Sequence, residues 1–317
     1  MPIISSDFRA AWWLPGAHAQ TLWPSLFRRR RPPPIEWERL ELEDGDFLDL
    51  AWSGPVEGPI VLFMHGLEGG LYSHYAGGIM RQLNRRGFRV CLMHFRGCSG
   101  EPNRLPVSYH SGKTDDPQLV LEHLRTNRQR QVYGAVGVSL GGNLLLKWLG
   151  EQGGRSPLRK AVALSVPFVL EDAARRLQQG LSRLYQRHLI ASLQERYRDK
   201  FRRIASPLQV EVDQLRDFYR FDDRVTAPLH GFSGAEEYYQ RCSCRQYIPA
   251  IRVETLILHA RNDPFMFPDT PPTEHELPDN VRLELTEEGG HMGFVRGVIP
   301  GWADYWAEQR IAQWLSD

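Results

Sequence analysis

Short, continuous runs of apolar residues recur along most of the chain, and helical spacing follows several of them. Such runs occupy residues 59–64, 88–93, 132–138 and 160–166. A run of this length with no polar alternation is typical of a strand that is buried on both faces of a sheet. The alternation of these runs with helical segments predicts an α/β fold with a mostly parallel sheet and helices on both faces.

The flanking segments extend this pattern at both ends. Residues 35–42 and 47–50 are separated by Asp44-Gly45, which predicts a hairpin of two strands. Two further strands are predicted at residues 254–259 and 281–285. A closing helix is predicted from apolar side chains that stand four residues apart in two pairs, Trp302 with Trp306 and Ile311 with Leu315.

Strand-helix alternation stops between residues 171 and 248, where the chain is rich in Arg, Gln and Leu. The spacing there predicts helices at about residues 172–177, 181–201 and 236–241. We therefore expect one core with an inserted helical cap, in which leucines such as Leu184 and Leu193 cover a ligand. A structural support without contact to the ligand is the alternative. The predicted parts are an N-terminal strap and connector (1–34), a core (35–170 and 249–317) and the cap (171–248).

Composition and charge narrow the class of protein. The 317 residues are 42% hydrophobic, and 39 Lys+Arg against 38 Asp+Glu leave a net charge of +1. This balance offers no concentrated basic surface for nucleic acid. We find no apolar stretch long enough to span a membrane and no secretory signal, so we expect a cytoplasmic protein. The arginines at 28–31 predict a solvated connector, with weak contact to anionic lipid head groups as the alternative.

The chain has four cysteines, too few for a disulfide scaffold, which favours a reducing compartment. Cys242 and Cys244 with His259 or His230 would be a zinc site only if further ligand pairs supported it, and none does. We interpret the cysteines as structural thiols. No metal or organic cofactor is predicted.

The sharpest chemical signal is a G-x-S-x-G motif, Gly137-Val138-Ser139-Leu140-Gly141, between a predicted strand and a predicted helix. A nucleophilic serine on such a turn has a strained backbone, and small neighbours leave room for the turn. The motif in this context predicts Ser139 as a nucleophile.

A serine hydroxyl needs a base, and the base needs an acid to orient it. Asp263 follows the predicted strand at 254–259, and His291 follows the one at 281–285. Both come from the carboxyl ends of strands, where open α/β sheets bind ligands. The order Ser, Asp, His is the one used on strand-helix scaffolds, so we predict Asp263 as the acid and His291 as the base.

A tetrahedral intermediate also needs N–H donors for its oxygen. The loop His65-Gly66-Leu67-Glu68-Gly69 follows the strand at 59–64, and we assign the donors to the backbone amides of Leu67 and Leu140. His65 is interpreted as a packing and hydrogen-bonding residue. His110 and Asp115 form an H-x-x-x-x-D pattern known from some acyltransferases, but Asp115 is better explained as a helix cap.

Together these residues resemble the α/β-hydrolase superfamily, and within it the group of bacterial YheT-type hydrolases, plant EMB8-like proteins and eukaryotic ABHD lipid hydrolases. The resemblance runs from Trp12-Trp13-Leu14-Pro15-Gly16 and Gln20-Thr21, through the motifs above and Phe95-Arg96-Gly97-Cys98-Ser99-Gly100, to Asp263-Pro264 and Gly290-His291. It implies the α/β-hydrolase fold and a cytoplasmic serine esterase that acts on acyl esters, with Ser139, Asp263 and His291 as its triad.

We therefore expect a carboxylic ester hydrolase for small-molecule acyl esters of short or medium chain, or of the monoacylglycerol type. Acyl transfer on the same triad and a non-catalytic acyl-binding protein are the alternatives. Neither stable membrane insertion nor a nucleic-acid partner is expected.

Overall fold

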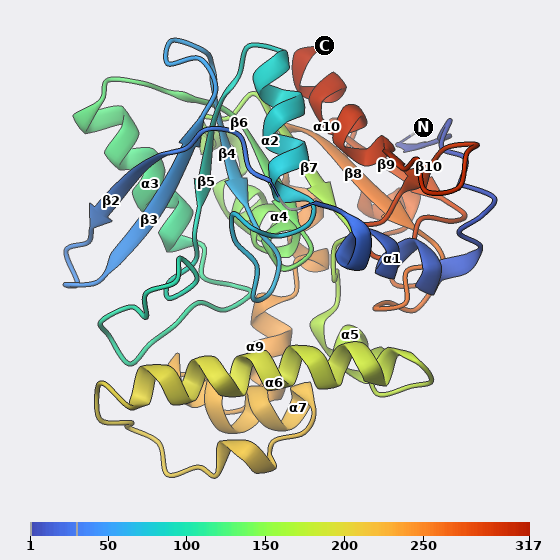
Figure 1. Cartoon of the computed structure of the whole chain (residues 1–317). Helices are drawn as coiled ribbons and strands as arrows, with labels where there is room; N and C mark the ends of the chain where they lie inside the picture. Colours follow the sequence, from blue (N-terminus) through green and yellow to red (C-terminus); the bar gives the residue numbers. More distant parts are fainter. Residues whose placement is uncertain (1, 30) are drawn as a thin grey trace.

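A nine-stranded sheet runs through the centre of the computed structural model, which describes residues 2–29 and 31–317 (Figure 1). The strand order is β1-β9-β8-β7-β6-β4-β5-β3-β2. Every neighbouring pair from β1 to β5 is parallel, and β3 and β2 add an antiparallel edge. The strands are β1 (Ile3–Ile4), β2 (Glu36–Glu41), β3 (Phe47–Ser53), β4 (Ile60–Met64), β5 (Arg89–Met93), β6 (Val132–Val138), β7 (Lys160–Leu164), β8 (Glu254–Ala260) and β9 (Val281–Thr286).

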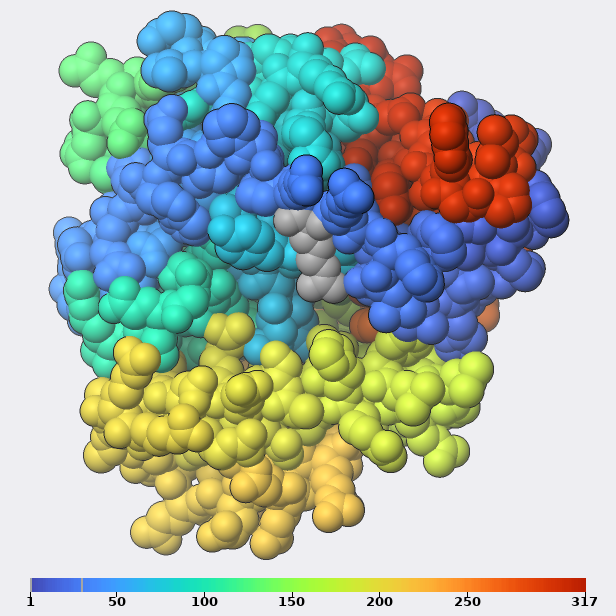
Figure 2. Space-filling view, viewed as in Figure 1, coloured from blue at the N-terminus to red at the C-terminus, as the bar shows by residue number. Residues whose placement is uncertain are grey.

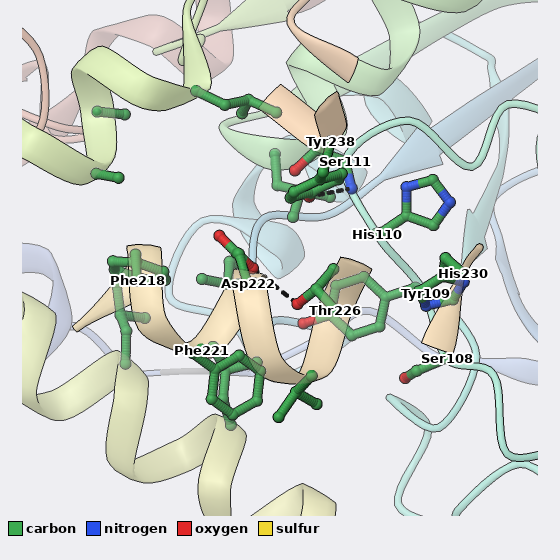
Figure 3. A pocket seen from close by; sticks show the side chains of 18 of the residues that line it. Ser108, Tyr109, His110, Ser111, Phe218, Phe221, Asp222, Thr226, His230 and Tyr238 are labelled. Carbon is green, nitrogen blue, oxygen red and sulfur yellow. Dashed lines mark hydrogen bonds between the residues drawn. The ribbon is translucent and has the colours of Figure 1, made fainter. Parts of the chain in front are cut away.

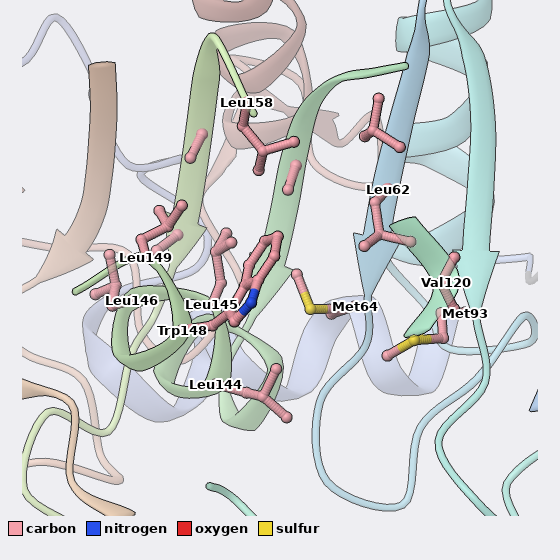
Figure 4. Close-up of a cluster of buried hydrophobic side chains, with 14 of the residues drawn as sticks. Leu62, Met64, Met93, Val120, Leu144, Leu145, Leu146, Trp148, Leu149 and Leu158 are labelled. Atoms are coloured by element: carbon pink, nitrogen blue, oxygen red, sulfur yellow. The ribbon is translucent and has the colours of Figure 1, made fainter. Parts of the chain in front are cut away.

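Helices cover both faces of this sheet, because its central strands are apolar on both sides. In β4, Leu62 packs in a cluster with Trp148 (Figure 4), whereas the next residue, Phe63, packs with Ile79 and Ile311 on the opposite face. The mostly parallel α/β fold predicted from the sequence is thus confirmed. The covering helices are α2 (Ala76–Arg85) and α10 (Trp306–Ser316) on one face, and α3 (Asp115–Asn127) and α4 (Leu140–Gln152) on the other.

The segment between β7 and β8 is helical, as its spacing predicts, and it packs around a small apolar cluster of its own. We call residues 170–242 the α5–α9 layer. In Figure 1 it lies as a separate layer below the sheet, beneath α4. Its elements are α5 (Leu170–Leu177), α6 (Ser182–Phe201), α7 (Phe218–Phe221), the π-helical turn η3 (Asp222–Thr226), α8 (Ala227–Leu229) and α9 (Ala235–Cys242).

The N-terminal segment, predicted as a strap, contains a strand and a helix. Its first strand extends the sheet, with Ile3 opposite Leu283 of β9, and a helix, α1 (Gly16–Phe27), follows. The predicted solvated connector is wrong at Arg28, whose side chain is 9% exposed and forms an ion pair with Glu308 of α10. Arg30 lies outside the described residues.

The predicted closing helix is also shorter than its apolar spacing indicated. Trp302 is not part of it but lies 77% exposed in the turn before β11 (Asp304–Tyr305), which pairs with β10 (Val295–Arg296). Helix α10 starts only at Trp306. None of the helices in the described residues is both long enough and apolar enough to cross a membrane.

Candidate active site

Ser139 occupies the sharp turn between β6 and α4. Its backbone has φ +52° and ψ −117°, a strained conformation for a residue with a side chain. The two motif glycines make the turn possible. A Cβ atom on Gly137 would lie 2.3 Å from the Gly141 carbonyl oxygen, and one on Gly141 would lie 2.5 Å from that of His65. The turn therefore holds the Ser139 side chain at the carboxyl end of the sheet.

The structure brings the three predicted side chains together. His291 Nε2 lies 3.0 Å from Ser139 Oγ, and His291 Nδ1 lies 2.7 Å from Asp263 Oδ2. His291 and Asp263 are almost fully buried. Since a carboxylate only accepts hydrogen bonds, Asp263 favours the tautomer with the proton on Nδ1. Nε2 is then free to accept the proton of the Ser139 hydroxyl.

Phe265 holds the plane of the histidine ring. Its ring stacks on the His291 imidazole with centroids 3.9 Å apart and planes 5° apart. The backbone N–H of Phe265 also donates to Asp263 Oδ1 over 2.8 Å. One residue thus orients both the acid and the base, and the sequence pattern did not reveal it.

Helix α1 contacts the backbone of the loop that carries His291. The backbone N–H of His291 donates to Thr21 Oγ1 over 2.9 Å, and Thr21 Oγ1 donates to the carbonyl of Ala17 over 2.7 Å. The contact is close, because a Cβ atom on Gly290 would lie 2.5 Å from the Ala17 carbonyl oxygen. The Gln20-Thr21 segment stood out in the sequence only through the family resemblance, without a role.

The predicted oxyanion donors have free N–H groups. In the loop after β4, the N–H of Gly66 donates to Tyr75 Oη, that of Glu68 donates to Tyr109 Oη, and that of Gly69 donates to the carbonyl of Gly66. Within the described residues the N–H of Leu67 has no acceptor, and neither has that of Leu140, the first residue of α4. These two amides remain available to a ligand.

The residue after Leu67 connects this loop to helix α6. The buried carboxylate of Glu68 accepts hydrogen bonds from Tyr109 Oη (2.7 Å) and Ser192 Oγ (2.8 Å). Arg196 Nε donates to both of its oxygens (2.8 and 2.9 Å). Glu68 itself has φ +54°. The loop is therefore positioned by the α5–α9 layer as well as by the sheet.

A cavity lies between Ser139 and the α5–α9 layer (Figure 3). It encloses about 1140 Å³ of empty space, open solvent at its mouth included. Ser139 and the two residues with free amides line it together with side chains from α5, α6, α7, η3, α8 and α9. Its apolar wall includes Leu170, Leu177, Leu189, Leu193, Phe218, Phe221 and Val225.

Two of the leucines singled out in the sequence behave differently. Leu193 lines the cavity, whereas Leu184 of the same helix is 59% exposed to solvent. The prediction that both face a ligand is therefore wrong for Leu184. Helix α6 directs one face to the cavity and the other to water.

His65 lies beside the site as a neutral packing residue. It is fully buried, its Nδ1 lies 2.7 Å from the Gly66 carbonyl, and its Nε2 accepts from the N–H of Phe95 over 3.1 Å. Burial lowers the pKa of His65 to about 3. This agrees with the packing interpretation and leaves His291 as the histidine next to the serine.

The weaker candidates do not assemble as their patterns suggested. Asp115 pairs with Lys113 over 2.5 Å, not with His110, and the prediction that it caps helix α3 is wrong, because Thr114 is the N-cap residue and Asp115 the first residue of the helix. Cys242 and Cys244 are buried free thiols. The part of the chain that the structure describes contains no group of three or more residues able to hold a metal ion.

Comparison with known proteins places this geometry in a family. Residues 59–298 match the α/β-hydrolase fold family. The chain is 41% identical to YheT of Escherichia coli (strain K12), a protein that carries an esterase name, over 98% of this chain and 94% of that one. It is 28% identical to the monoacylglycerol lipase of Saccharomyces cerevisiae (strain ATCC 204508 / S288c), over 75% of this chain and 55% of that one. The solved esterase Pf2001 of Pyrococcus furiosus superposes with a TM-score of 0.55 at 16% identity, over 91% of this chain and 98% of that one.

The chain therefore belongs to the α/β-hydrolase fold family, as the resemblance of its motifs indicated. Within that family it falls in the class of carboxylic ester hydrolases, together with its esterase and lipase relatives.

Proposed function

We propose that the protein is a serine hydrolase of acyl esters of short or medium chain, or of the monoacylglycerol type, with Ser139, His291 and Asp263 as its triad. The observation that carries this proposal is the continuous hydrogen-bond path from Asp263 through His291 to Ser139 at the wall of an apolar cavity. An apolar cavity next to a nucleophile suits an ester with a hydrocarbon chain.

In the first half of the reaction, Ser139 Oγ attacks the ester carbonyl while His291 Nε2 takes its proton. The Asp263 carboxylate stabilises the imidazolium that forms. The carbonyl oxygen becomes negative and accepts hydrogen bonds from the amides of Leu67 and Leu140. His291 then gives its proton to the alkoxide of the leaving alcohol, and the acyl group remains on Ser139.

In the second half, water replaces the alcohol. His291 removes a proton from the water as it attacks the acyl-enzyme, and returns that proton to Ser139 when the acid leaves. The same acyl-enzyme passes its acyl group to an alcohol where an alcohol enters in place of water. Analysis of the products formed with and without added ethanol separates hydrolysis from acyl transfer.

The α5–α9 layer acts in this proposal as a cap that selects the substrate. Its support is that Leu189 and Leu193 line the same cavity as Ser139. The small esters that reach Ser139 without filling the cavity are expected to depend least on this layer.

Replacement of the nucleophile tests the proposal. We expect Ser139→Ala to lose nearly all hydrolysis of p-nitrophenyl butyrate, since loss of a triad nucleophile elsewhere costs on the order of a million-fold in turnover. A fluorophosphonate probe should label the wild type on Ser139 and leave the variant unlabelled. Ser53→Ala is the matched control, a buried serine on β3 that hydrogen-bonds with Asn84 and lies outside the triad. Wild-type turnover by Ser139→Ala would refute the assignment.

A further inference from the structure

Two histidines outside the triad share one part of the cavity wall (Figure 3). His110 lies in the loop between β5 and α3, and His230 follows α8. Their ring centroids are 4.5 Å apart. Neither residue is used in the mechanism above, and two imidazoles side by side in a mostly apolar cavity are suited to a polar ligand.

Their N–H groups have no acceptor within the described chain. The backbone N–H of Gly112 donates to His110 Nδ1 over 3.1 Å, so the neutral ring carries its own proton on Nε2. Among the residues that the structure describes, nothing accepts from His110 Nε2, and no hydrogen bond reaches either ring nitrogen of His230. In either tautomer His230 has one N–H. The pair therefore offers two unused donors.

A buried positive charge lies in the same cavity wall. Lys200 is 4% exposed, and its Nζ donates to the carbonyls of Val107 (2.7 Å), Leu105 (3.2 Å) and Pro106 (3.4 Å). No carboxylate of the described residues lies within ion-pair distance of it. Burial lowers the pKa of Lys200 to about 8, so the amine is still mostly protonated at pH 7. The charge is compensated by carbonyl dipoles and, at longer range, by the Asp46 carboxylate, which itself pairs with Arg96.

Other charges near the pair do not cancel this one. Lys113 is paired with Asp115 and Lys147 with Glu151. Asp222 is the acidic residue of the cavity wall, but it accepts from Thr226 Oγ1 and Tyr239 Oη, and Figure 3 shows it apart from the two histidines, toward Phe218. Burial and the nearby lysines keep the pKa of His230 low, at about 4, so the ring is a neutral donor at pH 7.

We propose that His110, His230 and Lys200 form a subsite for an oxyanion, a carboxylate or a phosphate, which the substrate carries at the end remote from its ester. The inference rests on the proposed function, because it assigns a substrate class to the same cavity. Two N–H donors and a cation that is close enough to act on His230, and that has no carboxylate in ion-pair distance, are groups that bind an oxyanion in a weakly polar setting. A cation fits less well, because His110 Nδ1 is already an acceptor and no third ligand is present in the described residues.

A binding experiment tests this subsite without turnover. The Ser139→Ala protein is titrated by calorimetry with monomethyl octanedioate, which is anionic, and with dimethyl octanedioate, its neutral match. A second pair, 1-octanoylglycerol 3-phosphate and 1-octanoylglycerol, distinguishes phosphate from carboxylate. We expect the anionic member of at least one pair to bind about tenfold more tightly than its neutral match.

Variants of the pair show whether the histidines cause the preference. His110→Phe/His230→Phe keeps the ring shapes and removes the N–H groups, and it should reduce the preference below twofold. His110→Gln/His230→Gln keeps a donor at each position and should retain most of it. If the phenylalanine variant unfolds, His230→Phe alone carries the same test, because this residue is only half-buried.

Each outcome decides one question. Equal affinity for both members of both pairs, or a preference that survives in the phenylalanine variants, overturns the subsite. If the Ser139→Ala protein prefers the anionic ligand but the wild type hydrolyses no ester, the proposed function is overturned and the subsite stands.

Discussion

Thr21 Oγ1 accepts a hydrogen bond of 2.9 Å from the backbone N–H of His291, although 270 residues separate the two in the chain. Thr21 is 6% exposed and lies on α1, in a segment outside the α/β core. The contact fixes the backbone of the histidine loop, whereas the His291 ring contacts Ser139 and Asp263. The N-terminal helix is therefore part of the site's support and not a peripheral addition.

Replacing Thr21 by Val should lower turnover with little effect on substrate binding. The change keeps the shape of the side chain but leaves the buried N–H of His291 without an acceptor, which costs about 1–3 kcal/mol. We expect kcat for p-nitrophenyl butyrate to fall about tenfold at a nearly constant KM. Thr21→Ser keeps the hydroxyl and serves as the control. A Thr21→Val protein with the kinetics of the wild type would contradict a positioning role.

Replacing Asp263 by Asn should leave the fold intact and favour the wrong tautomer of His291. Turnover is expected to fall by up to about ten-thousand-fold, the loss known for the same change in a serine protease triad. The matched control is Asp269→Asn, an exposed aspartate a few residues further on. A larger loss for the control, or for Asp222→Asn or Asp223→Asn, would move the assignment of the acid to that residue.

Glu68→Gln should weaken the oxyanion loop without touching the triad. An amide in place of the carboxylate loses its charge pairing with Arg196 and one of the accepted hydrogen bonds. Because Glu68 directly follows Leu67, the proposed donor would be held less firmly. Complete loss of one such donor costs about a hundred- to thousand-fold in turnover, so we expect a loss of about tenfold.

The measurement for Glu68 is kcat against KM for a short ester, together with the rate of fluorophosphonate labelling. Glu101→Gln is the control, since Glu101 pairs with Arg39 at an exposed position. An unchanged kcat in Glu68→Gln would show that the contact with helix α6 serves stability alone.

Stability should depend on pH through Asp222. Burial raises the pKa of this carboxyl from 3.8 to about 6, against smaller lowering effects of hydrogen bonds from Thr226 and Tyr239. Between about pH 4 and pH 6 the folded protein therefore holds a proton that the unfolded chain has released. The free energy of unfolding therefore falls as pH rises through this window, and the destabilisation by the ionised Asp222 is fully present above pH 6.

Asp222→Asn removes this titration, so the comparison of the two proteins isolates it. The free energy of unfolding, measured with urea at pH 4.5 and pH 7, should shift in favour of the variant at the higher pH. One pKa unit corresponds to about 1.4 kcal/mol, which limits the shift to about 3 kcal/mol. Effects of the substitution that do not change with pH cancel in this comparison, and the hydrogen bonds from Thr226 and Tyr239 to the ionised carboxylate are already included in the pKa of about 6. A shift in favour of the wild type would contradict the raised pKa.

The range of an interaction along the chain decides whether the sequence could reveal it. Ser139 sits in a local motif, and Asp263 and His291 each follow a strand whose apolar run is plain. Thr21 and Phe265 act through contacts with residues that no local pattern links to them. A spacing or a motif carries no information about such partners.

Two of the wrong predictions, those for Arg28 and Trp302, each have a cause that the local pattern does not contain. Arg28 belongs to a charge run, which is typical of a solvated surface, but its partner Glu308 lies 280 residues away. Trp302 continues the apolar spacing of α10, yet Pro300-Gly301 precede it and the chain turns there. Tertiary pairing decided the first case and turn chemistry the second.

Helix α6 offers a matched test of substrate selection. Leu193 and Leu184 are the same residue type on one helix, but only Leu193 lines the cavity, while Leu184 is 59% exposed. Leu193→Ala enlarges the cavity wall and removes apolar contact, and one buried methylene contributes about 0.8 kcal/mol. We therefore expect kcat/KM for p-nitrophenyl octanoate to fall several-fold more than that for p-nitrophenyl acetate, with little change in labelling of Ser139 by a small fluorophosphonate. Leu184→Ala should leave both esters and the labelling as in the wild type. Equal loss on both esters in Leu193→Ala, with labelling reduced in proportion, would mean that the α5–α9 layer supports the fold and does not select the acyl chain.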